Sequence, residues 1–447
     1  MRLDTITVRN FRCFRERQVA RLGPLTLLVG DNSTGKTSFL ALIRALWDVA
    51  VGHRVPDFKE DPYDLGSFEE IAHHRGGRGG HAETFEAEFD LGDFHFAATF
   101  GRHGTAPVPV RKALRRGDLW IEERWGQDRL SSLRVGNARG AWDLGVPDQR
   151  RTSVSIDDRF ATSLLAFAPS GERPAAASIG GACSAGGSTS FTKADEKQLN
   201  ELAASWHLVP PRYPALRPFA SAPVRSKPRR TYDPRRPTAD AEGDYIPMYL
   251  ADVYFRDREE WERLKVMLER FGQSAGLFDE VSIKQLGRKE SEPFQVHVRK
   301  YSGKLKGPRR NLIDVGYGVS QVLPVIFEIL RNLRLKTAPL LLLQQPEVHL
   351  HPSAQAALGS LFCQSASQHS QLVVETHSDH LLDRVRMDVR DRATTLHPDD
   401  VSILFFERDR LDVRIHSLRI DDQGNVLGAP SGYRQFFMDE TRRSLGL

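Results

Sequence analysis

The sequence predicts an α/β fold, because an apolar run, a glycine-rich loop and a helix-like stretch follow one another near the amino terminus. The apolar run is Leu25 to Val29, the loop Gly30 to Thr37 reads Gly-Asp-Asn-Ser-Thr-Gly-Lys-Thr, and Ser38 to Val49 has helical periodicity. A second apolar run, Leu340 to Leu343, indicates another buried strand. Strand, loop and helix stand in the order that a phosphate-binding loop requires, so we expect a P-loop fold that binds a nucleoside triphosphate.

The residue types in this loop suit phosphate binding. Glycines let backbone N–H groups approach phosphate oxygens closely, and a helix that begins at the loop adds a favourable dipole. The Lys36 ammonium can reach the β and γ oxygens, and the Thr37 hydroxyl can hold Mg²⁺. The remaining phosphate contacts are expected from four loop residues: Asn32, Ser33, Thr34 and Gly35.

Length and composition set further expectations. A chain of 447 residues predicts about two to three structural units. No stretch approaches the roughly 18 apolar residues that a membrane span needs, so no membrane association is expected. Met1 to Val8 already alternates like a strand and resembles no secretory signal, which predicts a cytoplasmic location. The three cysteines, Cys13, Cys183 and Cys363, lie far apart and are expected to be buried, reduced thiols.

Basic residues are clustered although Lys and Arg outnumber acids only by 63 to 58. The clusters occupy 111–116, 225–236 and 300–310. Such loops can contact the phosphate backbone of DNA. The alternative, which we favour at this stage, is that they are solvated surface loops without interleaved aromatic residues.

The secondary structure predicted for the first part of the chain is mostly β. Met1 to Val8 is expected to form an edge strand, and an antiparallel sheet follows between Glu83 and Trp142. Its clearest strands are Phe85 to Leu91, Phe94 to Phe100 and Leu119 to Trp125. Two compositionally biased stretches, Ala175 to Ser190 and Val209 to Asp240, predict long loops or partial disorder.

Helices dominate the prediction for the second part. Arg256 to Phe271 presents four large apolar residues at helical spacing and is expected to face a core. A helix from Val319 to Leu335 should bend at its internal proline. Nowhere does an apolar heptad persist, so long coiled-coil arms are not expected. The other predicted elements are the strand Gln371–Glu375, helices from about Ser353 and Ser378, the strands Val401–Glu407 and Leu411–Leu418, and a short terminal helix.

Four motifs stand in a recognisable order: the loop 30–37, then Asp-Val-Gly-Tyr-Gly-Val-Ser-Gln at 314–321, Gln-Gln-Pro-Glu-Val-His-Leu-His-Pro at 344–352 and Glu-Thr-His-Ser at 375–378. Together they resemble the ABC-type ATPase heads of the SMC, RecF and OLD group. They are most similar to stand-alone bacterial ATPases associated with antiphage defence. The resemblance implies that ATPase-head halves occupy 1–150, with an antiparallel β subdomain, and 311–447, separated by an inserted helical and loop region at 151–310.

The resemblance also implies roles for individual residues. Gly318, Ser320 and Gln321 stand at the signature motif, which in such heads contacts the γ-phosphate of ATP held by the opposite subunit. His377 stands at the switch-histidine position, and Arg12 matches a basic residue near the nucleotide. ATP and Mg²⁺ are the implied cofactors, whereas no residue is a secure match for the Q-loop glutamine.

The chain departs from the family pattern at Gln344 and Gln345. Position 344 usually carries an acid that orients the water shell of Mg²⁺, and position 345 often carries a glutamate that polarises the attacking water. An amide keeps the shape of the acid but lacks its charge and cannot accept the proton, so binding should survive better than turnover. Gln344 is either a natural feature of a slow ATP-binding clamp or an engineered substitution. Glu347 either supplies a substitute carboxylate or has a structural role.

The leading functional hypothesis is an ATP-gated switch. In it ATP closes a homodimer, or a higher even-numbered oligomer, that controls a separate effector such as a nuclease or toxin. The alternatives are a RecF-type clamp or repair ATPase that binds DNA through basic loops, and a scaffold with a vestigial nucleotide site. An ABC transporter subunit is disfavoured by the SMC-like opening. His349 and His351 are expected to pack locally, since no nearby Cys or acid completes a metal site.

Overall fold

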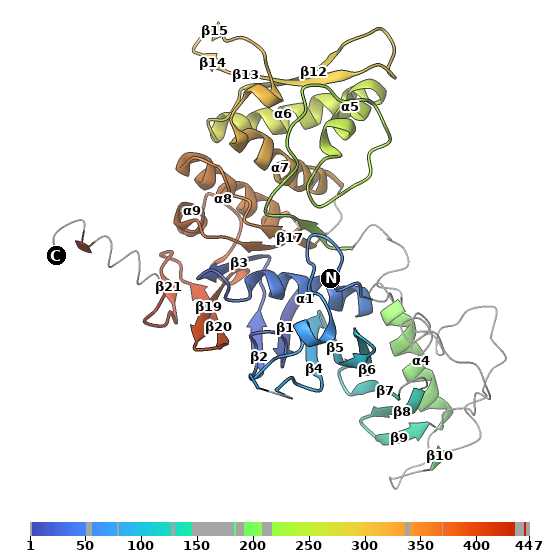
Figure 1. Cartoon of the computed structure of the whole chain (residues 1–447). Helices are drawn as coiled ribbons and strands as arrows, with labels where there is room; N and C mark the ends of the chain where they lie inside the picture. The colour runs from blue at the N-terminus through green and yellow to red at the C-terminus, as the bar shows by residue number, and fades with distance from the viewer. Residues whose placement is uncertain are drawn as a thin grey trace. The chain divides into compact units, whose positions relative to one another are not determined.

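A computed structural model describes residues 2–50, 56–77, 80–126, 130–144, 183–184, 192–207, 217–335, 340–368, 370–433 and 442–443. The chain divides into two compact units, each assembled from segments that are distant in sequence. Unit 1 comprises Met1–Arg21, Asp31–Arg217 and Phe406–Ile415. Unit 2 comprises Leu22–Gly30, Pro218–Phe405 and His416–Leu447. Figure 1 labels their helices and strands.

Unit 1 is built on an antiparallel sheet of nine strands in the order β10-β9-β8-β7-β6-β5-β4-β1-β2. Alternate residues of β4 are buried, and Phe85 stacks on Phe100 of β5 with ring centroids 4.8 Å apart. The predicted antiparallel subdomain is therefore confirmed. The strands are β1 (Leu3–Arg9), β2 (Gln18–Arg21), β4 (Phe85–Leu91), β5 (Phe94–His103), β6 (Ala106–Arg116), β7 (Leu119–Trp125), β8 (Leu130–Asn137), β9 (Gly140–Leu144) and β10 (Cys183–Ser184).

The first strand is not at the edge of this sheet, so that prediction is wrong. β1 pairs with β4 on one side and with β2 on the other. The edge is β2, which has only four residues and no alternation long enough to recognise. The partner β4 begins at Phe85, so this pairing comes from a segment far along the chain that local pattern does not reveal.

The helices of unit 1 include the one predicted after the glycine-rich loop. This helix, α1 (Lys36–Ala50), buries most of its side chains, among them Phe39, Leu42 and Leu46. The others are α2 (Phe68–Ile71) and α4 (Lys193–His207).

Unit 2 contains a seven-stranded sheet in the order β11-β17-β18-β3-β19-β20-β21. The end of β19, the start of β20 and the turn between them, Phe406–Ile415, group with unit 1. Strands β11, β17, β18 and β3 run parallel. Every residue of β17 and β18 is buried, which is typical of parallel strands covered on both faces. The strands are β3 (Leu25–Gly30), β11 (Phe219–Ser221), β17 (Leu340–Gln344), β18 (Gln371–Glu375), β19 (Val401–Asp409), β20 (Asp412–Ile420) and β21 (Val426–Leu427).

These parallel strands confirm the predicted α/β fold class. The segment Val209–Asp240 was predicted as loop, but its described part contains β11, which pairs with β17. A three-residue strand between Pro218 and Pro223 has too little pattern to be recognised from sequence. The stretch 175–190 lies outside the described residues except for β10, and most of the predicted terminal helix also lies outside them.

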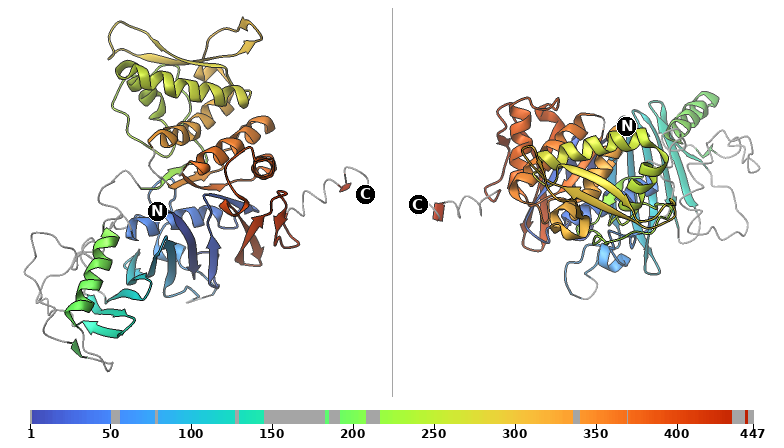
Figure 2. Two further views of the ribbon diagram at one scale, coloured as in Figure 1. Left: turned by 180° about the vertical axis from the view of Figure 1, so that it is seen from behind. Right: turned by 90° about the horizontal axis from the view of Figure 1, so that it is seen from above.

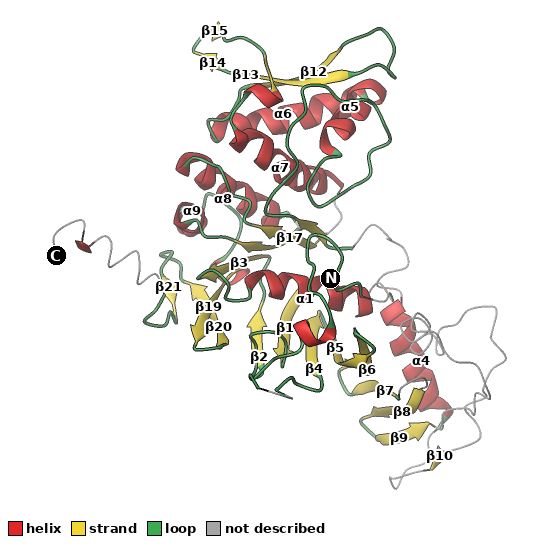
Figure 3. Cartoon of the chain, viewed as in Figure 1, coloured by secondary structure: helices red, strands yellow, loops and turns green. Residues whose placement is uncertain are grey.

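The helices of unit 2, red in Figure 3, include the predicted core-facing helix. This is α6, whose Trp261, Leu264 and Leu268 are buried as expected. Asp257 caps its start by accepting a hydrogen bond from the Glu260 N–H at 2.9 Å. The helices are α5 (Ile246–Arg256), α6 (Arg258–Ser274), η3 (Leu312–Asp314), α7 (Tyr317–Leu335), α8 (Pro352–Ser367), α9 (Asp379–Arg390) and η4 (Pro398–Asp400).

A small sheet packs on α6 in the same unit, as Figure 2 shows from two further sides. Its order is β12-β13-β16, and a short hairpin extends from it. Within the described ranges the longest helix is α7 with 19 residues, and no helix there is both long and apolar enough to cross a membrane. The strands are β12 (Glu280–Gln285), β13 (Phe294–Arg299), β14 (Tyr301–Ser302), β15 (Leu305–Lys306) and β16 (Arg310–Asn311).

Candidate nucleotide-binding site

The glycine-rich loop takes the backbone conformation that its sequence allows. Ser33 and Gly35 have positive φ angles of 60° and 86°. A Cβ atom at Gly35 would lie 2.4 Å from the Cys13 sulfur and 3.1 Å from Cζ of Phe14. Only glycine fits this position, because a side chain would be strained by the φ angle and would collide with the turn that carries Cys13.

The loop encloses the Lys36 ammonium. Lys36 is 3% exposed, and its Nζ donates to the Asp31 carbonyl at 2.5 Å. The Thr34 hydroxyl donates to the same carbonyl at 2.8 Å, whereas Asn32 and Ser33 are exposed. The Lys36 ammonium and the exposed backbone of the loop lie at the start of α1. This combination can bind a phosphate group. The residues of this loop therefore fit the triphosphate of ATP.

Arg12 lies against the first turn of α1. Its Nη1 donates to the Ser38 hydroxyl at 3.3 Å, and its Nη2 donates to the Leu65 carbonyl at 2.8 Å. Burial lowers the pKa of this guanidinium. Ser38 directly follows Thr37, so unit 1 places Arg12 next to the end of the loop.

Two further side chains touch the loop, and sequence reasoning assigned neither of them a role there. The Cys13 sulfur lies 3.8 Å from the Thr34 carbonyl, and burial raises the pKa of this thiol to about 11. Cys13 is half-buried and Cys363 buried, and both are free cysteines, whereas nothing is described for the Cys183 side chain. The Arg408 guanidinium donates to the Ser33 carbonyl.

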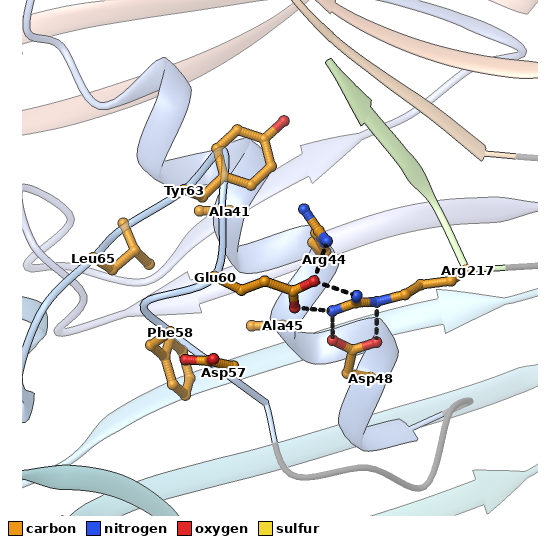
Figure 4. Close-up of a pocket in the computed structure, with 10 residues that line it drawn as sticks. All are labelled: Ala41, Arg44, Ala45, Asp48, Asp57, Phe58, Glu60, Tyr63, Leu65 and Arg217. Atoms are coloured by element: carbon orange, nitrogen blue, oxygen red, sulfur yellow. Dashed lines mark hydrogen bonds and ion pairs between the residues drawn. The ribbon is translucent and has the colours of Figure 1, made fainter. Parts of the chain in front are cut away.

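A cluster of four charged residues holds the middle of α1 (Figure 4). Arg217 donates through two nitrogens to Asp48, at 2.9 and 2.5 Å, and through two nitrogens to Glu60. Arg44 donates to Glu60 at 2.7 Å and to the Asp61 carbonyl at 2.7 Å. The hydrogen bonds that Arg217 donates to Glu60 and Asp48 raise the pKa of its guanidinium. The cluster ties α1 to the segment 57–65, whose Leu65 carbonyl binds Arg12.

In unit 2, the carboxyl ends of three adjacent parallel strands lie side by side and form what we call the strand-end edge of the sheet. Gln344 of β17 pairs with Glu375 of β18, and Glu375 pairs with Leu28 of β3. The pairing of the two strands extends by one residue, since the Gln345 backbone N–H donates to the Glu375 carbonyl at 2.9 Å. Gly30 ends β3 at this edge and leads directly into the loop. Ligands of open α/β sheets bind beyond the carboxyl ends of the strands, which is where Gln344 and Gln345 stand.

Hydrogen bonds fix the backbone of this strand end and the carboxylate of Glu347. The Gln344 N–H donates to the Ser221 hydroxyl of β11 at 3.1 Å, and Gln345 takes a positive φ of 41°. Glu347 is 7% exposed and accepts a hydrogen bond from the His377 N–H at 2.7 Å. Burial raises the pKa of Glu347. The His377 side chain is exposed, so its imidazole is accessible for a ligand.

The signature residues lie in the first turn of α7. The Ser320 hydroxyl donates to the Tyr317 carbonyl at 3.0 Å. A Cβ atom at Gly318 would lie 2.7 Å from the His349 carbonyl, so only a glycine lets this turn approach His349. Unit 2 thus brings the signature turn beside the segment that follows Gln344.

The two histidines of that segment show no metal-site geometry. The Nδ1 of His351 accepts from the Ser353 N–H at 3.3 Å and caps α8. Among the described residues there is no group of three or more His, Cys, Asp or Glu side chains placed to hold a metal ion.

Arg225 is a residue of this site that the sequence analysis assigned to a basic surface loop. It is 2% exposed, and its Nη2 donates to the carbonyls of Gln344 and Gln345 at 3.2 Å each. Its N–H donates to the Gln321 side chain at 3.0 Å. Burial lowers the pKa of Arg225 to about 10. Arg225 therefore cannot belong to a DNA-contacting surface.

Comparison with protein families finds ATPase domains in both motif-bearing parts of the chain. A family model described as "AAA ATPase domain" matches residues 1–89, which include the loop 30–37. A second, described as "AAA domain, putative AbiEii toxin, Type IV TA system", matches residues 189–383, which include the other three motifs. These matches confirm the resemblance to an ATPase head that the motifs predict. No curated protein matches the chain.

Solved structures of SMC heads are also similar to this chain. One is the SMC head bound to the C-winged helix domain of ScpA, with 11% identity, coverage of 94% of this chain and 98% of that chain, and a TM-score of 0.42. Another is the SMC head domain from Thermotoga maritima, with 12% identity, coverage of 93% and 99%, and a TM-score of 0.38.

Proposed function

We propose that this chain is an ATP-binding ATPase head that pairs with a second copy around ATP and so switches a separate effector protein. The observation that carries the proposal is the sheet edge of unit 2. There β17, β18 and β3 end together, and β3 continues into the loop that encloses Lys36. In this proposal residues 1–150 and 311–447 form the head, and 151–310 form the inserted region.

The proposed roles follow from the chemistry of each group. Backbone groups of Asn32 to Gly35 and the Lys36 ammonium bind the phosphates, and Arg12 adds a positive charge beside the start of α1. Lys36 exchanges the Asp31 carbonyl for phosphate oxygen when the nucleotide binds. Gly318 and Ser320 lie in the turn offered to the partner's nucleotide, and the exposed His377 contacts the γ-phosphate. Gln321, which the resemblance groups with them, is buried and supports this turn through its hydrogen bonds to Arg225.

Mg²⁺ is the metal that accompanies ATP in such heads, and Thr37 and Gln344 are the residues proposed to hold it. The half-buried Thr37 hydroxyl is a suitable oxygen donor, with the remaining ligands supplied by phosphate and water. The Gln344 amide oxygen is a neutral and weaker donor than the acid usual at this position. Bound Mg²⁺ neutralises phosphate charge, whereas Gln344 and Gln345 cannot take up a proton from water. We therefore propose firm binding and slow hydrolysis, with Glu347 as a structural acid that holds the His377 backbone.

Sedimentation velocity of the full chain with and without ATP and Mg²⁺ tests the proposal. ATP should convert the protein to a dimer or a larger even-numbered species, and Lys36→Ala should prevent this change. An unchanged sedimentation coefficient of the unmutated protein at saturating ATP would refute the switch.

The hairpin β14–β15 favours one alternative function. Lys300, Lys304, Lys306 and Arg310 around this hairpin are all exposed. A RecF-type clamp would use such residues to hold the DNA backbone, and its affinity would fall steeply with salt. Binding of duplex DNA that depends on ATP and weakens between 50 and roughly 200 mM salt would support this alternative.

A further inference from the structure

Arg225 is buried, yet only part of its hydrogen-bonding capacity is used. Its Nη2 is shared between two carbonyl oxygens. Within the part of the chain that the structure describes, its Nε and Nη1 are buried and have no hydrogen-bond partner. Buried guanidinium donors normally have partners, so this arrangement needs an explanation beyond simple stabilisation.

The backbone of Arg225 is fixed to the signature helix. The Gln321 side chain accepts from the Arg225 N–H at 3.0 Å and donates to the Arg225 carbonyl at 3.1 Å. Gln321 is 4% exposed and directly follows Ser320 in α7. Two hydrogen bonds therefore join the Arg225 backbone to the residue that follows Ser320 in α7.

The other end of Arg225 is fixed to the strand end. Its guanidinium bonds the carbonyls of Gln344 and Gln345, where β17 ends and the backbone turns with a positive φ. Glu347, two residues further on, is the buried acid whose charge favours the charged guanidinium.

We propose that Arg225 is a positioning residue that couples the end of β17 to the signature turn of α7 through Gln321. A shift of the Gln344–Gln345 carbonyls on nucleotide binding would move Arg225, and Gln321 would carry the movement to Ser320. This inference rests on the proposed function, because the property that is coupled is the ATP-dependent pairing of two heads.

The test separates nucleotide binding from ATP-dependent pairing in the full chain. Arg225→Lys keeps the positive charge but loses the forked donor geometry, and Gln321→Met keeps the length of the side chain but loses both hydrogen bonds. In each variant we expect ATP-dependent self-association, measured by sedimentation, to weaken about 5- to 150-fold. The affinity of dilute protein for a fluorescent ATP analogue should stay within about twofold of the unmutated value. Arg229→Lys, at an exposed residue paired with Asp244, is the matched control and should change neither quantity.

The outcomes distinguish this inference from the proposed function. Normal ATP-dependent association in both variants would overturn the inference alone. A parallel loss of nucleotide affinity, association and melting temperature would also overturn it, because Arg225 would then be a structural support. If Arg225→Lys does not fold, Gln321→Met tests the same link. Failure of the unmutated protein to associate with ATP would overturn the proposed function and with it the inference.

Discussion

The loop Gly30–Thr37 and the strand-end segment Gln344–His349 both carry residues of the proposed ATP site, but their contacts span different distances along the chain. Within the loop, Lys36 and Thr34 bond Asp31, which lies five and three residues away. The strand end is bonded by Arg225 and Ser221, which lie 119 and 123 residues from Gln344. The loop therefore closes on itself through local hydrogen bonds, to which Arg408 adds one distant contact at Ser33, whereas distant residues of unit 2 hold the strand end.

We expect the largest effect from Arg217→Leu, which tests whether ATP binding by the loop depends on the charged cluster on α1. Arg217→Leu removes the hydrogen-bonded guanidinium partner of the buried Asp48 and of the half-buried Glu60. Breaking a buried pair in this way should lower the free energy of unfolding by about 3 kcal/mol, measured by urea denaturation. If the loop is locally determined, the ATP affinity of the folded protein should remain within about twofold.

The control for this variant is an exposed pair in the same unit. Arg102→Leu removes an ion pair whose two side chains are 56% and 57% exposed, and should change the free energy of unfolding by less than about 1 kcal/mol. A tenfold loss of ATP affinity in Arg217→Leu would contradict the comparison. It would show that the segment 57–65 and its contact with Arg12 support the loop from a distance.

Replacement of Gly35 tests the loop's own geometry. In Gly35→Ala the new methyl group meets the Cys13 sulfur at 2.4 Å and the residue keeps a φ of 86°. We expect a loss of about 2–3 kcal/mol in unfolding free energy and a lower ATP affinity. Gly117→Ala is the matched control, since its φ is 58° and no atom lies within 4 Å of the added methyl. Its loss should be about 1–2 kcal/mol, and equal losses in the two variants would show that the contact with Cys13 is unimportant.

The same contrast explains what the sequence could predict. The loop, α1, β4, β7 and the amphipathic α6 were predictable because spacing within each segment determines them. The position of β1 and the existence of β11 were not, because distant partners decide both. Arg225 looked like a surface residue among other arginines, and it is buried because Gln321, 96 residues away, holds its backbone.

An acid at the strand end should affect ATP hydrolysis rather than ATP binding. Gln344→Glu supplies the charge that orients the water shell of Mg²⁺, and steady-state ATP hydrolysis should rise about 10- to 100-fold. ATP affinity should change little, because the loop supplies the phosphate contacts. An equally low rate in the restored protein would show that Gln344 does not limit turnover. Phosphate release is the measurement, and Gln364→Glu, at an exposed residue of α8, is the control for added charge.

The smallest expected effect concerns the pH dependence contributed by Glu347. Burial raises its pKa in the folded protein above the ordinary value of 4.5. Its contribution to stability is therefore fully present below pH 4.5 and is lost as the pH rises towards the raised value, because the unfolded chain releases the proton first. The difference in unfolding free energy between the unmutated protein and Glu347→Gln should change by at most about 1.4 kcal/mol per pH unit across this window. Urea denaturation at several pH values from 4.5 to roughly 7.5 measures it. A difference that does not vary with pH would mean that the strand end does not bury this acid, and that it is as open to solvent as Asn32 and Ser33 of the loop.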